Sequence, residues 1–160
     1  MTLLRATLWV VIFLVIFRVV LLPIRVTGIS MEPTKHDRSI NLVNEFAYLW
    51  HKPQRGDIVA IRFVPSDNSL EPPHVMLLKR IIGLPGETVA FVNGQVLING
   101  EILDEPYEKP YEMDPCNWNS APVTLGANQY YFVGDNRSMP PEYHTHGEYE
   151  RNRIVGKALF

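Results

Sequence analysis

Apolar residues follow two different patterns along this chain. Residues 3–22 are almost continuously apolar and carry charge only at Arg5 and Arg18. A helix of this length rises about 30 Å, the thickness of a bilayer's hydrocarbon core. Pro23 is expected to end the helix, because the residue before a proline is pushed out of helical geometry. Residues 1–24 are therefore predicted to be a transmembrane anchor. The alternative is a cleavable secretory signal, but no small-x-small cleavage site precedes Pro23.

The rest of the chain, residues 25–160, alternates short apolar runs with turn signals. Asn-Gly pairs at 93–94 and 99–100 favour tight hairpins, because both residues of such a turn need positive φ. Residues 65–73 are predicted to be a loop, and residues 104–122, with four prolines, an irregular insertion. Strands are predicted over 39–43, 57–63, 75–82, 88–92, 95–98, 101–103, 129–133 and 154–160. The fold class is therefore mainly β, with the helix followed by an all-β domain of two sheets or a distorted barrel.

Composition narrows the range of functions. The net charge of −2 over 160 residues provides no electrostatic argument for nucleic acid binding. The single cysteine, Cys116, excludes an internal disulfide and a multi-cysteine metal site. Glu142, His144, His146 and Glu148 could be read as metal ligands, but an exposed polar loop is the preferred interpretation. No metal or cofactor is expected.

Lys79 is the unusual residue of the predicted β domain. Alternate residues on its strand share a face, and those beside Lys79 are all apolar. Burial lowers the pKa of a lysine, and a neutral Lys79 would be a general base for a nearby hydroxyl. Ser30, between a glycine and a proline just after the apolar run, is the candidate nucleophile. The alternative is that Lys79 reaches solvent or pairs with an acid. Asp135, however, lies in a turn that can supply the acid for Arg80 instead.

Five segments carry a resemblance to a known family. They are Ser-Met-Glu-Pro-Thr at 30–34, Arg-Gly-Asp-Ile-Val at 55–59, Lys-Arg-Ile-Ile-Gly-Leu-Pro-Gly-Glu at 79–87, Gly-Asp-Asn-Arg at 134–137 and Ile-Val-Gly-Lys-Ala at 154–158. In this order they resemble the successive motifs of type I signal peptidases, which are membrane-bound serine/lysine peptidases. The resemblance implies the two-sheet β fold of that family, with Ser30 as nucleophile and Lys79 as general base.

The resemblance also implies supporting roles. Arg80 and Asp135 match an ion pair that braces the site, and Met31 and Pro33 match residues that shape the turn beside Ser30. The supporting residues it implies around the oxyanion and the base are Gly28, Arg80, Asp135, Arg137 and Glu142. Apolar pockets for the small residues before the cleavage site are expected to be lined by Ile29, Met31 and Leu78.

The chain departs from the family's pattern at four positions. Gly28 stands where some members have a serine that donates to the oxyanion. Pro140 stands where many members have a serine that hydrogen-bonds the base lysine, and Ser138 or a water is a possible substitute. Glu142 and His144 occupy the positions of an aspartate and an arginine.

The resemblance thus implies a membrane-anchored endopeptidase that removes signal peptides from exported preproteins. Its catalytic domain is expected on the outer face of the bacterial plasma membrane, with the N-terminus inside; an organellar inner membrane is the alternative. Signal peptides and the lipid bilayer are the expected partners, nucleic acid is not, and a monomer is expected. Two other functions stay open. One is a dedicated peptidase that matures conjugation or pilus components, and the other is a catalytically silent, anchored binding module.

Overall fold

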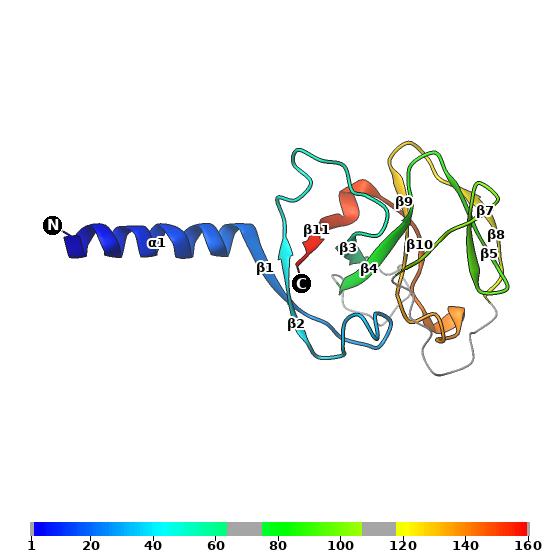
Figure 1. Ribbon diagram of the computed structural model, residues 1–160, viewed down its shortest axis with the longest axis horizontal. Helices are drawn as coiled ribbons and strands as arrows, with labels where there is room; N and C mark the ends of the chain where they lie inside the picture. The colour runs from blue at the N-terminus through cyan, green and yellow to red at the C-terminus, as the bar shows by residue number, and fades with distance from the viewer. Residues whose placement is uncertain (1, 64–74, 107–117, 160) are drawn as a thin grey trace.

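The computed structural model describes residues 2–63, 75–106 and 118–159 and shows a long helix followed by a β-rich domain. The helix projects from the domain, and the two sheets lie beyond it (Figure 1). The predicted loop over 65–73 and the central part of the 104–122 insertion, Cys116 included, lie outside the described residues.

The long helix, α1 (Thr2–Val20), ends earlier than the apolar run. Leu21–Arg25 form strand β1, which pairs antiparallel with β2 (Ile40–Asn44). Pro23 was expected to end the helix but lies within β1. Because β1 is at the edge of its sheet, one side of the strand needs no hydrogen-bond donors and a proline is tolerated there.

None of the helices in the described part of the chain is both long and apolar enough to cross a membrane. The prediction of a membrane-spanning helix within residues 1–24 is therefore not met by these residues. The end of the apolar run pairs in a sheet instead, which leaves 19 helical residues that include Arg5 and Arg18.

The domain is built from two antiparallel sheets, as the sequence predicts. The larger sheet has seven strands in the order β1-β2-β11-β3-β4-β9-β10, and the smaller has four in the order β7-β6-β5-β8. The other strands of the larger sheet are β3 (Ile58–Phe63), β4 (Val75–Gly83), β9 (Gln129–Val133), β10 (Gly147–Glu150) and β11 (Ile154–Ala158). The smaller sheet contains β5 (Thr88–Val92), β6 (Gln95–Ile98), β7 (Glu101–Ile102) and β8 (Ser120–Thr124).

Three strands have no counterpart among the predicted ones, namely β1, β8 and β10. All three lie at a sheet edge. An edge strand has only one strand neighbour and needs less apolar character than a central one, so β8 can contain Pro122 and β10 can read Gly-Glu-Tyr-Glu. The two predicted hairpins are present, with φ of 50° and 82° at Asn93 and Gly94 and of 53° and 87° at Asn99 and Gly100.

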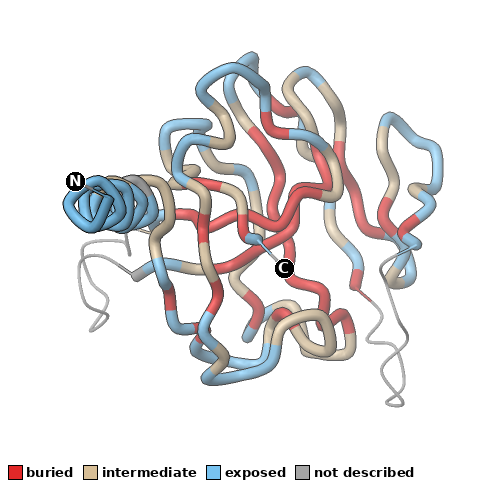
Figure 2. The backbone as a smooth tube through the Cα atoms, turned by 60° about the vertical axis from the view of Figure 1, so that its left-hand side comes forward, coloured by how far each residue is buried: buried red, intermediate tan, exposed pale blue. Residues whose placement is uncertain are grey.

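Buried residues concentrate along the central strands and in the turn that follows β9 (Figure 2). The two sheets meet through an aromatic contact in which the ring of Phe91 on β5 lies 6.0 Å from Tyr131 on β9 and 5.3 Å from Trp118. Trp118 is fully buried and belongs to the core. This packing holds the turn after β9 beside the larger sheet, where the candidate site lies.

Asp57, directly before β3, fixes the start of that strand. Its carboxylate accepts hydrogen bonds from the Tyr48 hydroxyl at 2.9 Å, the Gln54 amide at 3.0 Å and Lys157 Nζ at 2.6 Å. Because these partners come from the β2–β3 connection and from β11, Asp57 joins three segments of the larger sheet and has a structural role.

Candidate active site

The turn that carries Ser30 is held by a residue from the other end of the domain. The Asn136 amide donates to the Ser30 carbonyl at 3.0 Å, and Asn136 Nδ2 donates to the Ile29 carbonyl at 3.0 Å. On the other side, Gly28 has a φ of 98°, which favours glycine, and its amide donates to Asp37 Oδ1 at 2.8 Å. These contacts fix the backbone on both sides of Ser30 and so give its hydroxyl a defined direction.

Lys79 projects from β4 towards that hydroxyl. It pairs in register with Val59 of β3, is only 2% exposed, and its Nζ lies 2.9 Å from Ser30 Oγ. Burial lowers the pKa of Lys79 from 10.5 to about 8, and the nearby charge of Asp135 opposes that shift. A nucleophile and a base thus lie within hydrogen-bonding distance.

The neighbouring residue, Arg80, takes the nearest carboxylate. Arg80 Nε lies 2.7 Å from Asp135 Oδ1 and Nη2 lies 2.6 Å from Oδ2, while Nη1 donates to the Gly56 carbonyl at 2.7 Å. Both side chains of this ion pair are almost fully buried. Because both oxygens of Asp135 face Arg80, Lys79 does not use that carboxylate as an ion-pair partner.

Arg137 braces the same turn from the opposite side. It forms a two-pronged ion pair with Glu105, at 2.5 and 3.2 Å, and its Nε donates to the Gly134 carbonyl at 2.9 Å. Its guanidinium carbon lies 5.9 Å from the centre of the Phe91 ring. The turn from Gly134 to Arg137 is therefore tied to both sheets.

A small pocket lined by both polar and apolar groups opens beside Ser30. Its volume is about 20 Å³, slightly more than the space one water molecule needs. Met31 and Leu78, two of the residues expected to form substrate pockets, line it, but Ile29 does not and is 48% exposed. The full lining consists of Ile24, Arg25, Val26, Thr27, Ser30, Met31, Met76, Leu77 and Leu78.

The family is decided by a comparison with known families. The family described as signal peptidase, peptidase S26, matches residues 1–160 of the chain. The chain belongs to this family. The S26 signal peptidases are serine endopeptidases, and in this chain Ser30 lies in contact with a buried lysine.

Individual relatives agree. The chain is 34% identical over 131 residues to signal peptidase I of Leptolyngbya laminosa, a match that covers 81% of this chain and 63% of that protein. It is 35% identical over 159 residues to signal peptidase I S of Bacillus subtilis (strain 168), covering 94% of this chain and 82% of the relative. The chain thus spans less than two thirds of the length of the Leptolyngbya protein. A crystal structure of a signal peptidase I from Enterococcus faecalis V583 is 28% identical, with a TM-score of 0.45, over 68% of this chain and 97% of that one.

Two of the positions at which this chain departs from the family's pattern are explained by local structure. Gly28 has positive φ and its amide is already bonded to Asp37, so neither a serine side chain nor that amide serves the oxyanion. Pro140 precedes the short 3₁₀ helix η1 (Pro141–Tyr143). Ser138, the suggested substitute near the lysine, directs its hydroxyl to Asn136 Oδ1 at 2.6 Å.

Glu142 was expected to support the site, but it is exposed on η1 and the structure shows no ion pair for it within the described residues. Glu142 and Glu148 are exposed, as the polar-loop interpretation expects, but Glu142 lies on η1 and Glu148 on β10. The interpretation is wrong for His144, which is 3% exposed. His146 Nδ1 lies 3.0 Å from the Tyr131 hydroxyl. Among the residues described here, no three His, Cys, Asp or Glu side chains are grouped to hold a metal.

Three residues of the candidate site were not predicted to belong to it: Asn136, Glu105 and His144. Asn136 lies inside the Gly-Asp-Asn-Arg motif, so the motif itself was the available signal. Glu105 lies in a segment predicted to be irregular, and only the fold shows that it meets Arg137. His144 stands where the family has an arginine, and that substitution was its one signal.

Proposed function

We propose that this chain is a serine endopeptidase that removes N-terminal signal peptides from exported preproteins. In this proposal Ser30 is the nucleophile and Lys79 is the general base. The observation that carries it is the 2.9 Å contact between Lys79 Nζ and Ser30 Oγ, made by a lysine that is 2% exposed. Membership of the S26 family supports the same reaction class.

The lowered pKa makes Lys79 a usable base. With a pKa of about 8 in place of 10.5, the neutral fraction at pH 7 rises roughly 300-fold, to about one molecule in ten. Neutral Lys79 takes the Ser30 proton while Oγ attacks the carbonyl before the scissile bond. Lys79 then passes the proton to the leaving amine. Lys79, neutral again, then deprotonates the water that hydrolyses the acyl-enzyme.

The negatively charged oxygen of the tetrahedral intermediate needs hydrogen-bond donors that have no other partner before the reaction. Within the described residues the Ser30 amide donates to no backbone carbonyl, so it is the candidate donor. Loss of one oxyanion donor typically costs about 3 kcal/mol of barrier. The firm hold of Asn136 on the Ile29 and Ser30 carbonyls keeps this amide in a fixed orientation.

An extended substrate fits beside β4. Strand β3 pairs with β4 from Val75 to Arg80, whereas β9 pairs with β4 only from Arg80 to Gly83. The β9-side edge of residues 75–79 therefore has no strand partner in the described part of the chain and can pair with an extended peptide. The adjoining pocket of about 20 Å³ suits a side chain no larger than that of alanine.

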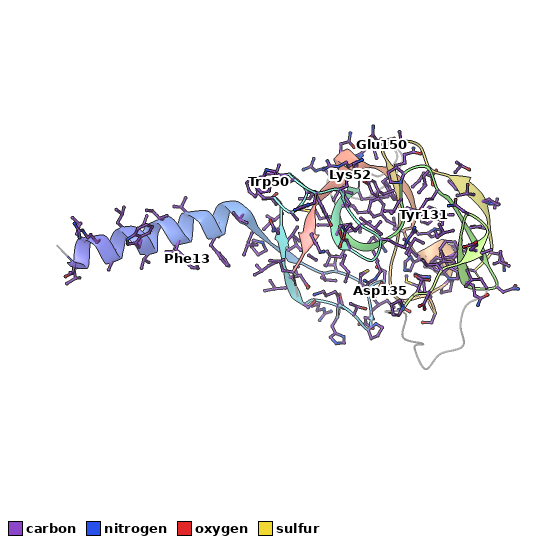
Figure 3. All side chains as sticks on the ribbon, turned by 45° about the horizontal axis from the view of Figure 1, so that its top comes forward. Phe13, Trp50, Lys52, Tyr131, Asp135 and Glu150 are labelled. Atoms are coloured by element: carbon purple, nitrogen blue, oxygen red, sulfur yellow. The ribbon has the colours of Figure 1, made fainter. Side chains whose placement is uncertain are left out.

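The domain is proposed to work at a membrane. Glu45 N donates to the carbonyl of Val20, the last residue of α1, at 3.2 Å, and the segment that follows exposes Leu49 (60%) and Trp50 (80%). Trp50 lies on the side of the domain nearest α1 (Figure 3). Tryptophan favours the membrane–water interface. We place this end of the domain against the outer face of the bacterial plasma membrane, where exported chains emerge.

The test is cleavage of a preprotein by the full chain in detergent or liposomes. We expect cleavage after a small residue, and its loss in Ser30→Ala, Lys79→Ala and Lys79→Arg, because arginine stays protonated. Lys52→Arg is the matched control, since Lys52 is exposed and lies outside the site.

Three outcomes separate the candidate functions. Cleavage that depends on Ser30 and Lys79 supports the proposal and rules out a silent binding module. Cleavage restricted to a conjugation or pilus precursor would identify a dedicated maturation peptidase. Full activity in Lys79→Arg would refute the general-base role.

A further inference from the structure

His144 lies where the nucleophile's turn meets the turn after β9. It follows η1, is 3% exposed, and packs its ring edge-on against Trp118 with ring centres 5.0 Å apart. A Cβ atom built on Gly134 would lie 2.5 Å from His144 Nε2 and would also collide with the Ser30 carbonyl oxygen. His144 Nε2 and the Ser30 carbonyl therefore approach the same face of Gly134.

The ring of His144 is polar but unpaired. Neither Nδ1 nor Nε2 has a hydrogen-bond partner within the part of the chain that the structure describes. The Ser30 backbone is close enough to raise the pKa of His144, yet the geometry is not that of a hydrogen bond. Buried polar atoms without partners are rare in proteins and destabilise the fold, so two on one ring indicate a functional constraint.

Burial and the positive charges around the ring keep His144 neutral. Burial is the main cause that lowers the pKa of His144, to about 3, and the positive charge of Lys79 is the next. His146 and Arg137 act in the same direction, and the Ser30 backbone acts against them. At neutral pH the imidazole therefore offers one N–H donor and one bare nitrogen acceptor.

The base of this site needs such a polar neighbour. A neutral lysine can accept the Ser30 proton only if its lone pair points at Oγ, so its remaining N–H groups need partners that orient the amine. Among the described residues, Ser30 Oγ is the one hydrogen-bonding side chain at Lys79 Nζ. Pro140 has no polar side-chain atom, and the Ser138 hydroxyl is bonded to Asn136.

We propose that His144 is a positioning residue for the Ser30–Lys79 pair. Its neutral imidazole lies beside the Ser30 carbonyl, against the same face of Gly134, and is near enough to Lys79 for the charge of the lysine to act on it. This role rests on the proposed function, because it concerns the orientation of the same base.

The experiment compares His144→Phe with His144→Gln in preprotein cleavage. Phenylalanine keeps the ring against Trp118 and removes both nitrogens, whereas glutamine places a polar atom near the Nε2 position. We expect His144→Phe to lower kcat by about tenfold to a hundredfold, because a base misplaced by about 1 Å loses this much. KM should stay within about twofold, since substrate binding is not touched. His144→Gln should recover kcat to within about threefold of the unchanged protein.

His146→Phe is the matched control. It lies in the same aromatic cluster, with its ring 4.9 Å from Trp118, but its nitrogen pairs with the Tyr131 hydroxyl. Its kcat should stay within about twofold of the unchanged value. If His144→Phe does not fold, His144→Met, which also lacks a polar nitrogen, replaces it.

The outcomes are distinct. A wild-type kcat in His144→Phe, or equal losses in His144→Phe and His144→Gln that follow their melting temperatures, would refute the role of His144 alone. A protein that cleaves no preprotein would refute the proposed function and this role with it.

Discussion

The buried Arg80–Asp135 ion pair leads to a prediction in which two variants move the pH profile in opposite directions. Asp135 raises the pKa of Lys79 by favouring its charged form. In Asp135→Asn that charge is gone, so the pKa of Lys79 should fall below about 8 and the acid limb of kcat/KM should move to lower pH. In Arg80→Gln the Asp135 charge loses its partner and acts on Lys79 without compensation. The pKa should rise, and the acid limb should move to higher pH.

The two variants should also lose stability to a similar extent. The side chains of Arg80 and Asp135 are 7% and 1% exposed, so removal of either leaves the other charge buried and unpaired. Such a loss typically costs about 3–5 kcal/mol. For a chain of this size it corresponds to a fall in Tm of about 6–20 °C. Arg38→Gln is the matched control: its ion pair with Asp37 spans 3.5 Å and Arg38 is 79% exposed, so about 0–1 kcal/mol is expected.

The assay is kcat/KM for preprotein cleavage from pH 6 to 10, with thermal unfolding followed by circular dichroism on the same preparations. A general collapse of the site would lower activity in both variants without opposite shifts of the acid limb. Shifts in the same direction, or none, would therefore refute the electrostatic coupling between Asp135 and Lys79.

Three further predictions concern other parts of the chain. Leu78→Phe should fill the pocket of about 20 Å³ beside Ser30 and lower kcat/KM about tenfold or more for a substrate with alanine before the scissile bond. An unchanged kcat/KM would show that the pocket does not bind the substrate. Glu105→Gln should leave Arg137 buried without its ionised partner and lower the free energy of unfolding, measured with urea, by about 3 kcal/mol. Trp50→Ser should weaken co-sedimentation of the full chain with phosphatidylglycerol vesicles, whereas Ile102→Ser, which removes another exposed apolar residue, on β7, should not; equal effects would exclude a specific contact at Trp50.

The sequence predicted the centre of the fold better than its edges. The central strands β3, β4, β5 and β9 are mostly apolar, and the two Asn-Gly turns require positive φ whatever surrounds them. The edge strands β1, β8 and β10 form because a neighbouring strand offers hydrogen bonds, and no local pattern reports that neighbour. The same effect shortened the predicted helix, since Leu21 and Leu22 pair with β2.

The site shows a similar division. Lys79 could be singled out because a charged residue in an apolar strand is a local anomaly, and Ser30 because it opens a recognisable motif. Asn136 and Glu105 act on residues more than 30 positions away in the chain, so their partners are visible only in the fold. Glu142 was placed by motif position alone, yet η1 leaves it exposed and buries His144 instead.

The central claim is that Lys79 is a neutral base for Ser30. The most direct measurement is the pH dependence of kcat/KM for preprotein cleavage by the unchanged protein, with Lys79→Arg beside it. Because the ammonium form cannot accept a proton, the rate should fall about tenfold per pH unit below an apparent pKa of about 8, and Lys79→Arg should be inactive throughout. An acid limb near the ordinary lysine value of 10.5, or cleavage by Lys79→Arg at the unchanged rate, would contradict the account.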